Sequence, residues 1–171
     1  MSVLYVGGDR VAELEEIYNN YFKDVYLFIY SLSRDKHMAE DLTSETFLKA
    51  VKSVEGFKGH CDIRVWLFQI AKNTYYSYIK KRRDTVDLAS VPEKDDGFDV
   101  EKTVFLSEAS MKIHEILHNL PEPYKEVFSL RVFGELSFKQ IGHLFGKSGN
   151  WACVTFHRAK NKIKEEMGDY R

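Results

Sequence analysis

Apolar side chains recur at helical spacing through the first half of the chain. From Leu14 to Leu32 eight of them follow one another at intervals of one, three or four residues, which predicts an amphipathic helix of more than five turns. A second helix is predicted over residues 38–54, and a third from residue 66 to about residue 83. The inward positions of the second helix would be Ala39, Thr43, Thr46, Phe47, Ala50 and Val54. Those of the third would be Leu67, Ile70, Ala71, Thr74 and Tyr78.

The pattern stops at residues 84–102, which have no sustained apolar period. This stretch contains seven acidic side chains, two lysines, Pro92 and Gly97, a composition typical of a linker. Helical patterns resume over residues 104–119, 122–133 and 137–145, with Pro121 expected in the first turn of the middle one. Ser137 and Gln140 have the spacing of a capping box.

The last helix is predicted to start at Gly149, after a turn of residues 146–149 in which Ser148 is a candidate cap. Its inward stripe would be Ala152, Phe156, Ala159, Ile163 and Met167. Its outward face would be Asn150, Val154, His157, Arg158, Asn161 and Lys164. Two helices, a four-residue turn and a basic outer face are typical of a helix-turn-helix, although a plain packing pair has the same spacing.

These elements predict an all-α fold of two small helical lobes joined by an acidic flexible linker, with the helix-turn-helix in the C-terminal lobe. The expected divisions are residues 10–83, 84–103 and 104–171. No strand is predicted.

Composition narrows the class of protein. With 44% hydrophobic and 14% aromatic residues the chain has enough apolar surface for packed cores. The net charge of −1 argues neither for nor against a polyanionic partner, but the acidic residues are concentrated in residues 84–102, so the rest of the chain is basic. Cys61 and Cys153 have no disulfide framework, which favours reduced thiols in a cytosol. No signal peptide or membrane insertion is predicted.

Two groups of residues suggest metal chemistry. His114, Glu115 and His118 match the H-E-x-x-H pattern of zinc hydrolases, for which Glu135 or His143 would be the nearest third ligands. The same segment is also an ordinary amphipathic helix. His60, Cys61 and Asp62 form the second group, but no further candidate ligand follows them at a spacing typical of a metal site. We expect no metal, no cofactor and no enzymatic activity, with a zinc hydrolase as an alternative.

Two further surfaces suggest partners. Glu40, Asp41, Ser44, Glu45 and Leu48 share the outer face of the second predicted helix, where an exposed leucine among acids hints at protein binding. Tyr75, Tyr76 and Tyr78 precede Lys80-Lys81-Arg82-Arg83, a combination that suits unpaired nucleic acid as well as a solvated helix end.

Five stretches in order resemble a known family. "YFKDVYLFIY", "HMAEDLTSETFLKAV", "FKGHCDIRVWLFQIAKNTYYSYIKKRR", "LPEPYKEVFSLRVFGELSFKQIGHLFG" and "VTFHRAKNKIK" look like an extracytoplasmic-function (group 4) sigma factor of the sigma-70 family. The resemblance implies a stress-responsive transcription initiation factor. Its partners would be core RNA polymerase, through the clamp of the largest subunit and the beta flap, promoter DNA, and an anti-sigma protein that could hold it at the membrane.

The resemblance also implies sites. Polymerase contacts would be Glu40, Asp41, Leu42, Ser44, Glu45 and Leu48. Contacts to the minus-ten element, including a pocket for a flipped base, would be Lys58, His60, Cys61, Asp62, Arg64, Asn73, Tyr76, Ser77, Lys80 and Arg83. Contacts of the helix-turn-helix to the minus-thirty-five element would be Ser137, Lys139, Gln140, Ser148, Asn150, Trp151, Cys153, Val154, His157, Arg158 and Lys160.

This sequence departs from the family pattern at Ser44, Ser77 and residues 150–155, where fewer cations start the last helix. We therefore expect apolar and shape contacts to carry more of the recognition there. The main alternative is a stand-alone helix-turn-helix regulator, which should bind duplex DNA tightly without polymerase.

Overall fold

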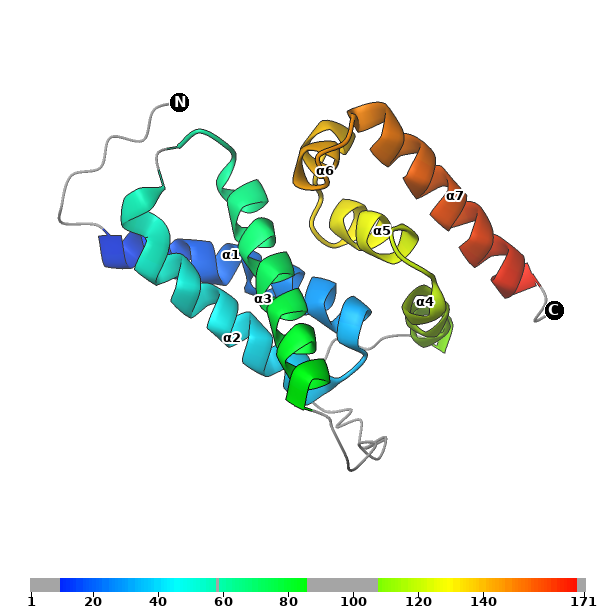
Figure 1. The fold of residues 1–171 in the computed structure, drawn as a ribbon, viewed down its shortest axis with the longest axis horizontal. Helices are drawn as coiled ribbons and strands as arrows, with labels where there is room; N and C mark the ends of the chain where they lie inside the picture. The colour runs from blue at the N-terminus through cyan, green and yellow to red at the C-terminus, as the bar shows by residue number, and fades with distance from the viewer. Residues whose placement is uncertain (1–9, 58, 86–107, 169–171) are drawn as a thin grey trace.

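The structure is a computed structural model that describes residues 10–57, 59–85 and 108–168. Figure 1 shows two groups of helices side by side. The first is α1 (Arg10–Ser33), α2 (Lys36–Ser53), a 3-10 turn η1 (Val54–Gly56) and α3 (Ile63–Thr85). The second is α4 (Glu108–Asn119), α5 (Tyr124–Val132), α6 (Phe138–Leu144) and α7 (Gly149–Gly168). The described residues contain no strand, which confirms the all-α, two-lobe prediction.

The first lobe is built on α1, which packs against both α2 and α3. Phe28 and Phe68 are fully buried where α1 meets α3, with their ring centroids 5.4 Å apart. Both later helices start at an aspartate. The carboxylate of Asp35 accepts from the Met38 amide at 2.9 Å, and that of Asp62 accepts from the Arg64 amide at 2.8 Å. Each bond satisfies an amide that has no partner within the helix.

In the second lobe α4 and α5 both pack on α7. Ile116, Leu117 and Leu120 of α4 bury against Ala159 and Ile163 of α7. The capping box at Ser137 and Gln140 is present, and the Ser148 hydroxyl accepts from the Trp151 amide at 3.1 Å, as predicted. α6, the turn and α7 therefore form the predicted helix-turn-helix.

Some predicted boundaries were wrong. α5 begins at Tyr124 rather than Glu122, because the residue before a proline is pushed out of the helical region and Pro123 follows Glu122. α3 begins three residues earlier than predicted, at the Asp62 cap. Asp84 and Thr85, assigned to the linker, end α3. The rest of the predicted linker lies outside the described residues, as do residues 104–107 of the predicted fourth helix and Lys58.

The two lobes share one hydrophobic core. Val127 and Leu130 of α5, Leu136, Ile141 of α6 and Ala152 of α7 belong to the same buried cluster as Phe28 and Phe68. α5 contacts α1, and α6 contacts α3. The two lobes therefore pack directly on one another.

In the described residues no helix has the length and apolar character needed to cross a membrane.

The turn of the helix-turn-helix depends on a close approach at Gly142. A Cβ atom there would lie 2.6 Å from the carbonyl of Ser148. We expect Gly142→Ala to lower the free energy of unfolding by about 1–3 kcal/mol, the usual cost of overpacking. Gly168→Ala is the matched control, because nothing lies within 4 Å of its added carbon. Urea unfolding followed by circular dichroism measures both; equal stabilities would contradict the close approach.

Candidate polymerase and nucleic-acid interfaces

The outer face of α2 is accessible as predicted. Glu40, Asp41, Ser44, Glu45 and Leu48 are all exposed, and Leu48 is 60% exposed. Val51, one turn further on, is also exposed and extends the apolar surface. The Glu45 carboxylate pairs with Lys49 at 2.7 Å on the helix surface. Leu42 does not belong to this face: it is 2% exposed and lies in the core, so the prediction that it contacts polymerase was wrong.

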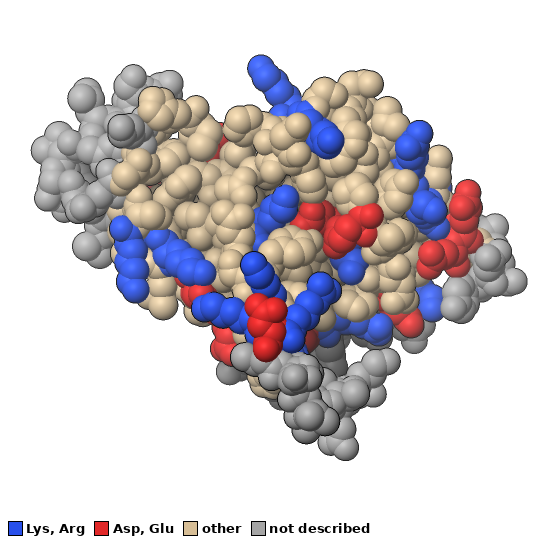
Figure 2. Space-filling model, in the orientation of Figure 1, with Lys and Arg blue, Asp and Glu red and all other residues tan. Residues whose placement is uncertain are grey.

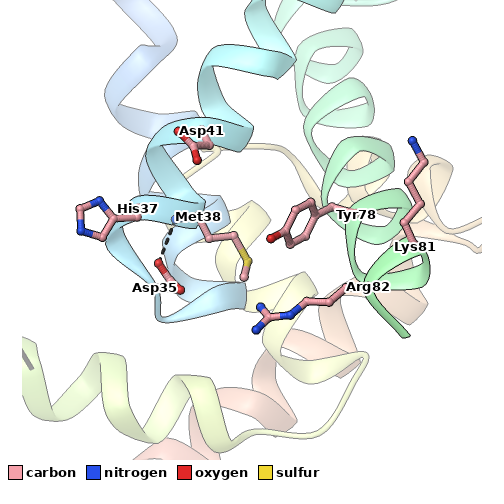
Figure 3. A pocket seen from close by; sticks show the side chains of 7 residues that line it. All are labelled: Asp35, His37, Met38, Asp41, Tyr78, Lys81 and Arg82. Carbon is pink, nitrogen blue, oxygen red and sulfur yellow. Dashed lines mark hydrogen bonds between the residues drawn. The ribbon is translucent and has the colours of Figure 1, made fainter. Parts of the chain in front are cut away.

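A pocket of about 590 Å³ lies at one end of this face, where the start of α2 meets the end of α3 (Figure 3). Asp35, His37, Met38 and Asp41 line one side, and Tyr78, Lys81 and Arg82 line the other. Tyr78 was predicted on the buried stripe of the third helix, but it is 38% exposed. The pocket therefore places carboxylates from α2 opposite cationic and aromatic side chains from α3.

Most predicted minus-ten residues lie exposed on α3 and the loop before it. His60, Cys61 and Asp62 are exposed, although Asp62 also caps the helix. Asn73, Ser77, Lys80 and Arg83 follow along one face of α3, because residues three or four apart in a helix are neighbours. The Asn73 amide oxygen accepts from Gln69 at 3.0 Å. This face can meet a nucleic-acid strand without rearrangement of its own helix.

Arg64 and Tyr76, by contrast, contact the second lobe. One guanidinium nitrogen of Arg64 donates to the Gly134 carbonyl at 3.1 Å and lies 2.7 Å from the Glu135 carboxylate. The Tyr76 hydroxyl is hydrogen-bonded to the Glu126 carboxylate. Two predicted DNA contacts are thus paired with carboxylates of the α5 region.

Glu126 is the most unusual group in this contact. It is 4% exposed, and Tyr76, Lys72, whose ammonium lies 4.0 Å away, and Lys125 oppose the effect of burial on its pKa. Burial therefore raises its pKa, and its Oε1 atom has no hydrogen-bond partner. A buried polar atom without a partner costs about 1–3 kcal/mol.

Glu122 lies close by, although the residue as a whole is exposed. Burial of its carboxyl, with the charge of Glu126 as the second cause, raises its pKa from 4.5 to about 7. Lys125 and hydrogen bonds from Tyr76 and the Glu126 amide oppose this rise. Burial also raises the pKa of Tyr76.

The predicted DNA-reading side chains of α7 are mostly accessible. Asn150, Val154, His157, Arg158 and Lys160 are exposed, as are Ser137, Lys139 and Ser148. Gln140 is engaged in the capping box. Cys153 is half-buried, and the half-buried Trp151 packs on Phe145 with ring centroids 5.2 Å apart. Figure 2 shows Lys and Arg side chains over both lobes, with acidic side chains among them.

The H-E-x-x-H segment lies on α4 and packs between the lobes. The His114 ring stacks on Phe133 at 5.5 Å and meets the edge of Tyr30 at 5.8 Å, and burial lowers its pKa. Glu135, considered as a third ligand, pairs with Arg64 instead. The described residues contain no group of three or more candidate metal ligands. His114 therefore has a packing role.

Both lobes match known protein families. Residues 17–85 match sigma-70 region 2, and residues 110–163 match sigma-70 region 4. The chain is 34% identical to the ECF RNA polymerase sigma factor SigM of Bacillus subtilis, over 88% of this chain and 93% of the relative. The chain belongs to the sigma-70 family. It is an extracytoplasmic-function sigma factor, as the five stretches of sequence indicated.

Other relatives agree with this assignment. The sigma factor is 28% identical to YlaC of Bacillus subtilis, over 90% of this chain and 91% of that one. Its fold is that of RpoE from Bartonella quintana, solved in complex with the anti-sigma factor NepR, with a TM-score of 0.70, 21% identity and coverage of 93% and 99%. CnrH, solved with the cytosolic domain of CnrY, has a TM-score of 0.69 at 15% identity, covering 94% and 90%.

The residues that join the lobes were not predicted. Ser129 is 0% exposed on α5, and its hydroxyl is 2.7 Å from that of Ser31. Glu126 and Ser129 do break the apolar pattern of residues 122–133, a signal that polar partners lie nearby. Nothing local indicates that these partners are in another lobe.

The carboxyls of Glu126 on α5 and of Glu122, just before this helix, make the packing of this sigma factor sensitive to pH. Glu122 has a raised pKa in the folded state, so its contribution is complete below about pH 4.5 and is lost as the pH rises to about 7. We expect the Tm of the wild-type protein to fall over this range relative to Glu122→Gln. The lowered pKa of His114 acts in the opposite direction but is common to both proteins. Parallel Tm profiles would contradict the prediction.

Proposed function

We propose that this sigma factor binds core RNA polymerase and directs it to a small set of promoters, with each lobe reading one element. The observation that supports the proposal best is the accessibility of two separate surfaces: the acidic and apolar outer face of α2, and the outward face of the helix-turn-helix. A stand-alone DNA-binding regulator needs only the second surface.

The face of α2 is the proposed site for the clamp of the polymerase largest subunit. Leu48 and Val51 provide solvent-exposed apolar surface. The carboxylates around it are those of Glu40, Asp41 and Glu45. A polar rim around a small apolar centre is a common arrangement at protein interfaces. Ser44, where the family often has glutamine, can still donate and accept hydrogen bonds. The second lobe is proposed to contact the beta flap.

Promoter recognition is proposed to use α3 for the minus-ten element and α7 for the minus-thirty-five element. The loop of His60, Cys61 and Asp62 would take a flipped base, since an unstacked base needs a pocket and stacking partners to recover its lost contacts. On α7, Asn150 can pair with adenine and Val154 can meet a thymine methyl. Arg158 and Lys160, both exposed, would contact phosphates.

Regulation by an anti-sigma protein is part of the proposal. RpoE was solved with the anti-sigma factor NepR and CnrH with the cytosolic domain of CnrY, and the fold is shared over nearly the whole chain. A membrane-bound inhibitor would hold the sigma factor at the membrane without any insertion of this chain.

Reconstitution tests the proposed function. Purified core polymerase with this protein should give promoter-specific transcripts, whereas the protein alone should not footprint duplex DNA tightly. No transcript from any promoter together with a strong footprint by the protein alone would favour the stand-alone regulator.

Glu45→Lys tests the docking face. Reversal of this exposed charge should weaken polymerase binding while leaving the affinity for duplex DNA nearly unchanged. Glu166→Lys, the same charge change at an exposed position of α7 far along the chain, is the control. Binding of labelled protein to core polymerase gives the readout; equal losses on polymerase and DNA, or no loss, would count against this face.

Arg158→Ala and Val154→Ala distinguish a proposed phosphate contact of α7 from a proposed base contact. Loss of one phosphate contact should weaken binding to all sequences and reduce the slope of log K against log salt by about 1. Loss of the Val154 methyl groups should change the preference among promoter variants instead. Titrations of both variants at several salt concentrations measure the two effects, and identical profiles would contradict the division of roles.

A further inference from the structure

The pocket between the start of α2 and the end of α3 lies outside the proposed promoter contacts, and it shares only Asp41 with the proposed polymerase contacts. Its volume of about 590 Å³ is within the range of small-molecule sites, which is about 300 to 1,000 Å³. We propose that this pocket binds a guanosine 5′-monophosphate, with the base on Asp41 and the phosphate on Arg82.

The charged groups of the pocket stand at different ends of it. Asp41 lies one turn beyond Met38 on α2, and residues at this spacing share one face of a helix. Arg82 lies one turn beyond Tyr78 on α3 in the same way. Figure 3 shows the Asp41 carboxylate and the Arg82 guanidinium at opposite ends, with Met38 and Tyr78 between them. A matching ligand has hydrogen-bond donors at one end and an anion at the other.

The middle of the pocket is suited to a flat ring. Met38 is half-buried and Tyr78 is 38% exposed, and the two side chains point toward one another from α2 and α3 (Figure 3). A planar heterocycle between them would contact an aromatic ring on one side and a polarisable thioether on the other. The site therefore favours a nucleobase over a flexible chain.

The carboxylate of Asp41 selects among the bases. Guanine presents two neighbouring donors, N1–H and the N2 amine, and the two oxygens of one carboxylate can accept from both. Adenine and cytosine present a donor beside an acceptor, which a carboxylate would repel. Asp35, the other carboxylate of the pocket, accepts from the Met38 amide as the cap of α2. Asp41 is therefore the carboxylate assigned to the base.

The other end of the pocket is suited to one phosphate. Arg82 is half-buried, and a guanidinium binds a phosphate through paired hydrogen bonds. Lys81 adds a second cation to the lining. Asp35 also lies toward this end (Figure 3), and its negative charge disfavours a longer phosphate chain. The balance of charges favours a monophosphate over a triphosphate.

Calorimetric titration of the full chain with free nucleotides tests the proposal. We expect GMP to bind, AMP to bind about tenfold more weakly or worse because it loses hydrogen bonds to a charged group, and GTP to bind more weakly than GMP. All titrations use the same ionic strength.

Asp41→Asn gives a reciprocal test of the base contact. An asparagine amide presents one acceptor and one donor, which match the N1–H and the 2-oxo group of xanthine. We expect this variant to lose about tenfold or more in affinity for GMP and to gain affinity for xanthosine 5′-monophosphate. A gain for one nucleotide cannot result from loss of the fold.

Arg82→Gln tests the phosphate contact. It should weaken binding of GMP while leaving the affinity for guanosine, which has no phosphate, nearly unchanged. Glu15→Gln on α1 and Lys52→Gln on α2 are the controls, because both residues are exposed and neither lines the pocket. Both controls should bind GMP as wild type does.

Several results would overturn the proposal. These are no binding of GMP, equal affinities for GMP and AMP, or an unchanged preference for GMP over xanthosine 5′-monophosphate in Asp41→Asn. A short thymidine strand with one central guanine that binds more tightly than GMP would also overturn it, because the pocket would then belong to an unpaired strand. These titrations need no polymerase, so their failure leaves the proposed function standing.

Discussion

Burial of α5 against the first lobe is the interaction on which the rest of this structure depends. Val127 and Leu130 join the core of Phe28 and Phe68, while Ser129 meets Ser31 in an enclosed hydrogen bond. Because buried hydroxyls need hydrogen-bond partners, this bond fixes the orientation in which the two lobes pack. The positions of α4, α6 and α7 follow from it, since each packs on α5 or on a helix that does.

α3 faces both the solvent and the second lobe. Its exposed residues form a cationic and aromatic surface suited to an unpaired strand, whereas Arg64, Lys72 and Tyr76 turn to the second lobe. Arg64 and Tyr76, which are proposed to contact promoter DNA, interact with carboxylates of the second lobe in this structure.

The sequence predicted the helices well, and its errors have physical causes. Leu42 was expected on the docking face with its neighbours in the chain, but its place on the helix turns it into the core. Tyr78 follows the apolar period of α3, but a pocket separates it from Met38 and Asp41 of α2, so its ring stays partly exposed. The start of α5 was missed because Pro123 acts on the residue before it.

Five motifs in order carried the resemblance to the family. The amino-acid pattern by itself determined the all-α class, the capping box and the helix-turn-helix, and it placed most candidate contacts on exposed faces. These features depend on residues three or four apart, whose geometry the helix fixes locally. Only the tertiary structure showed that Arg64 meets Glu135, that Tyr76 meets Glu126 and that Ser31 meets Ser129. Such pairs join residues far apart in the chain, and their meeting depends on how two complete lobes pack.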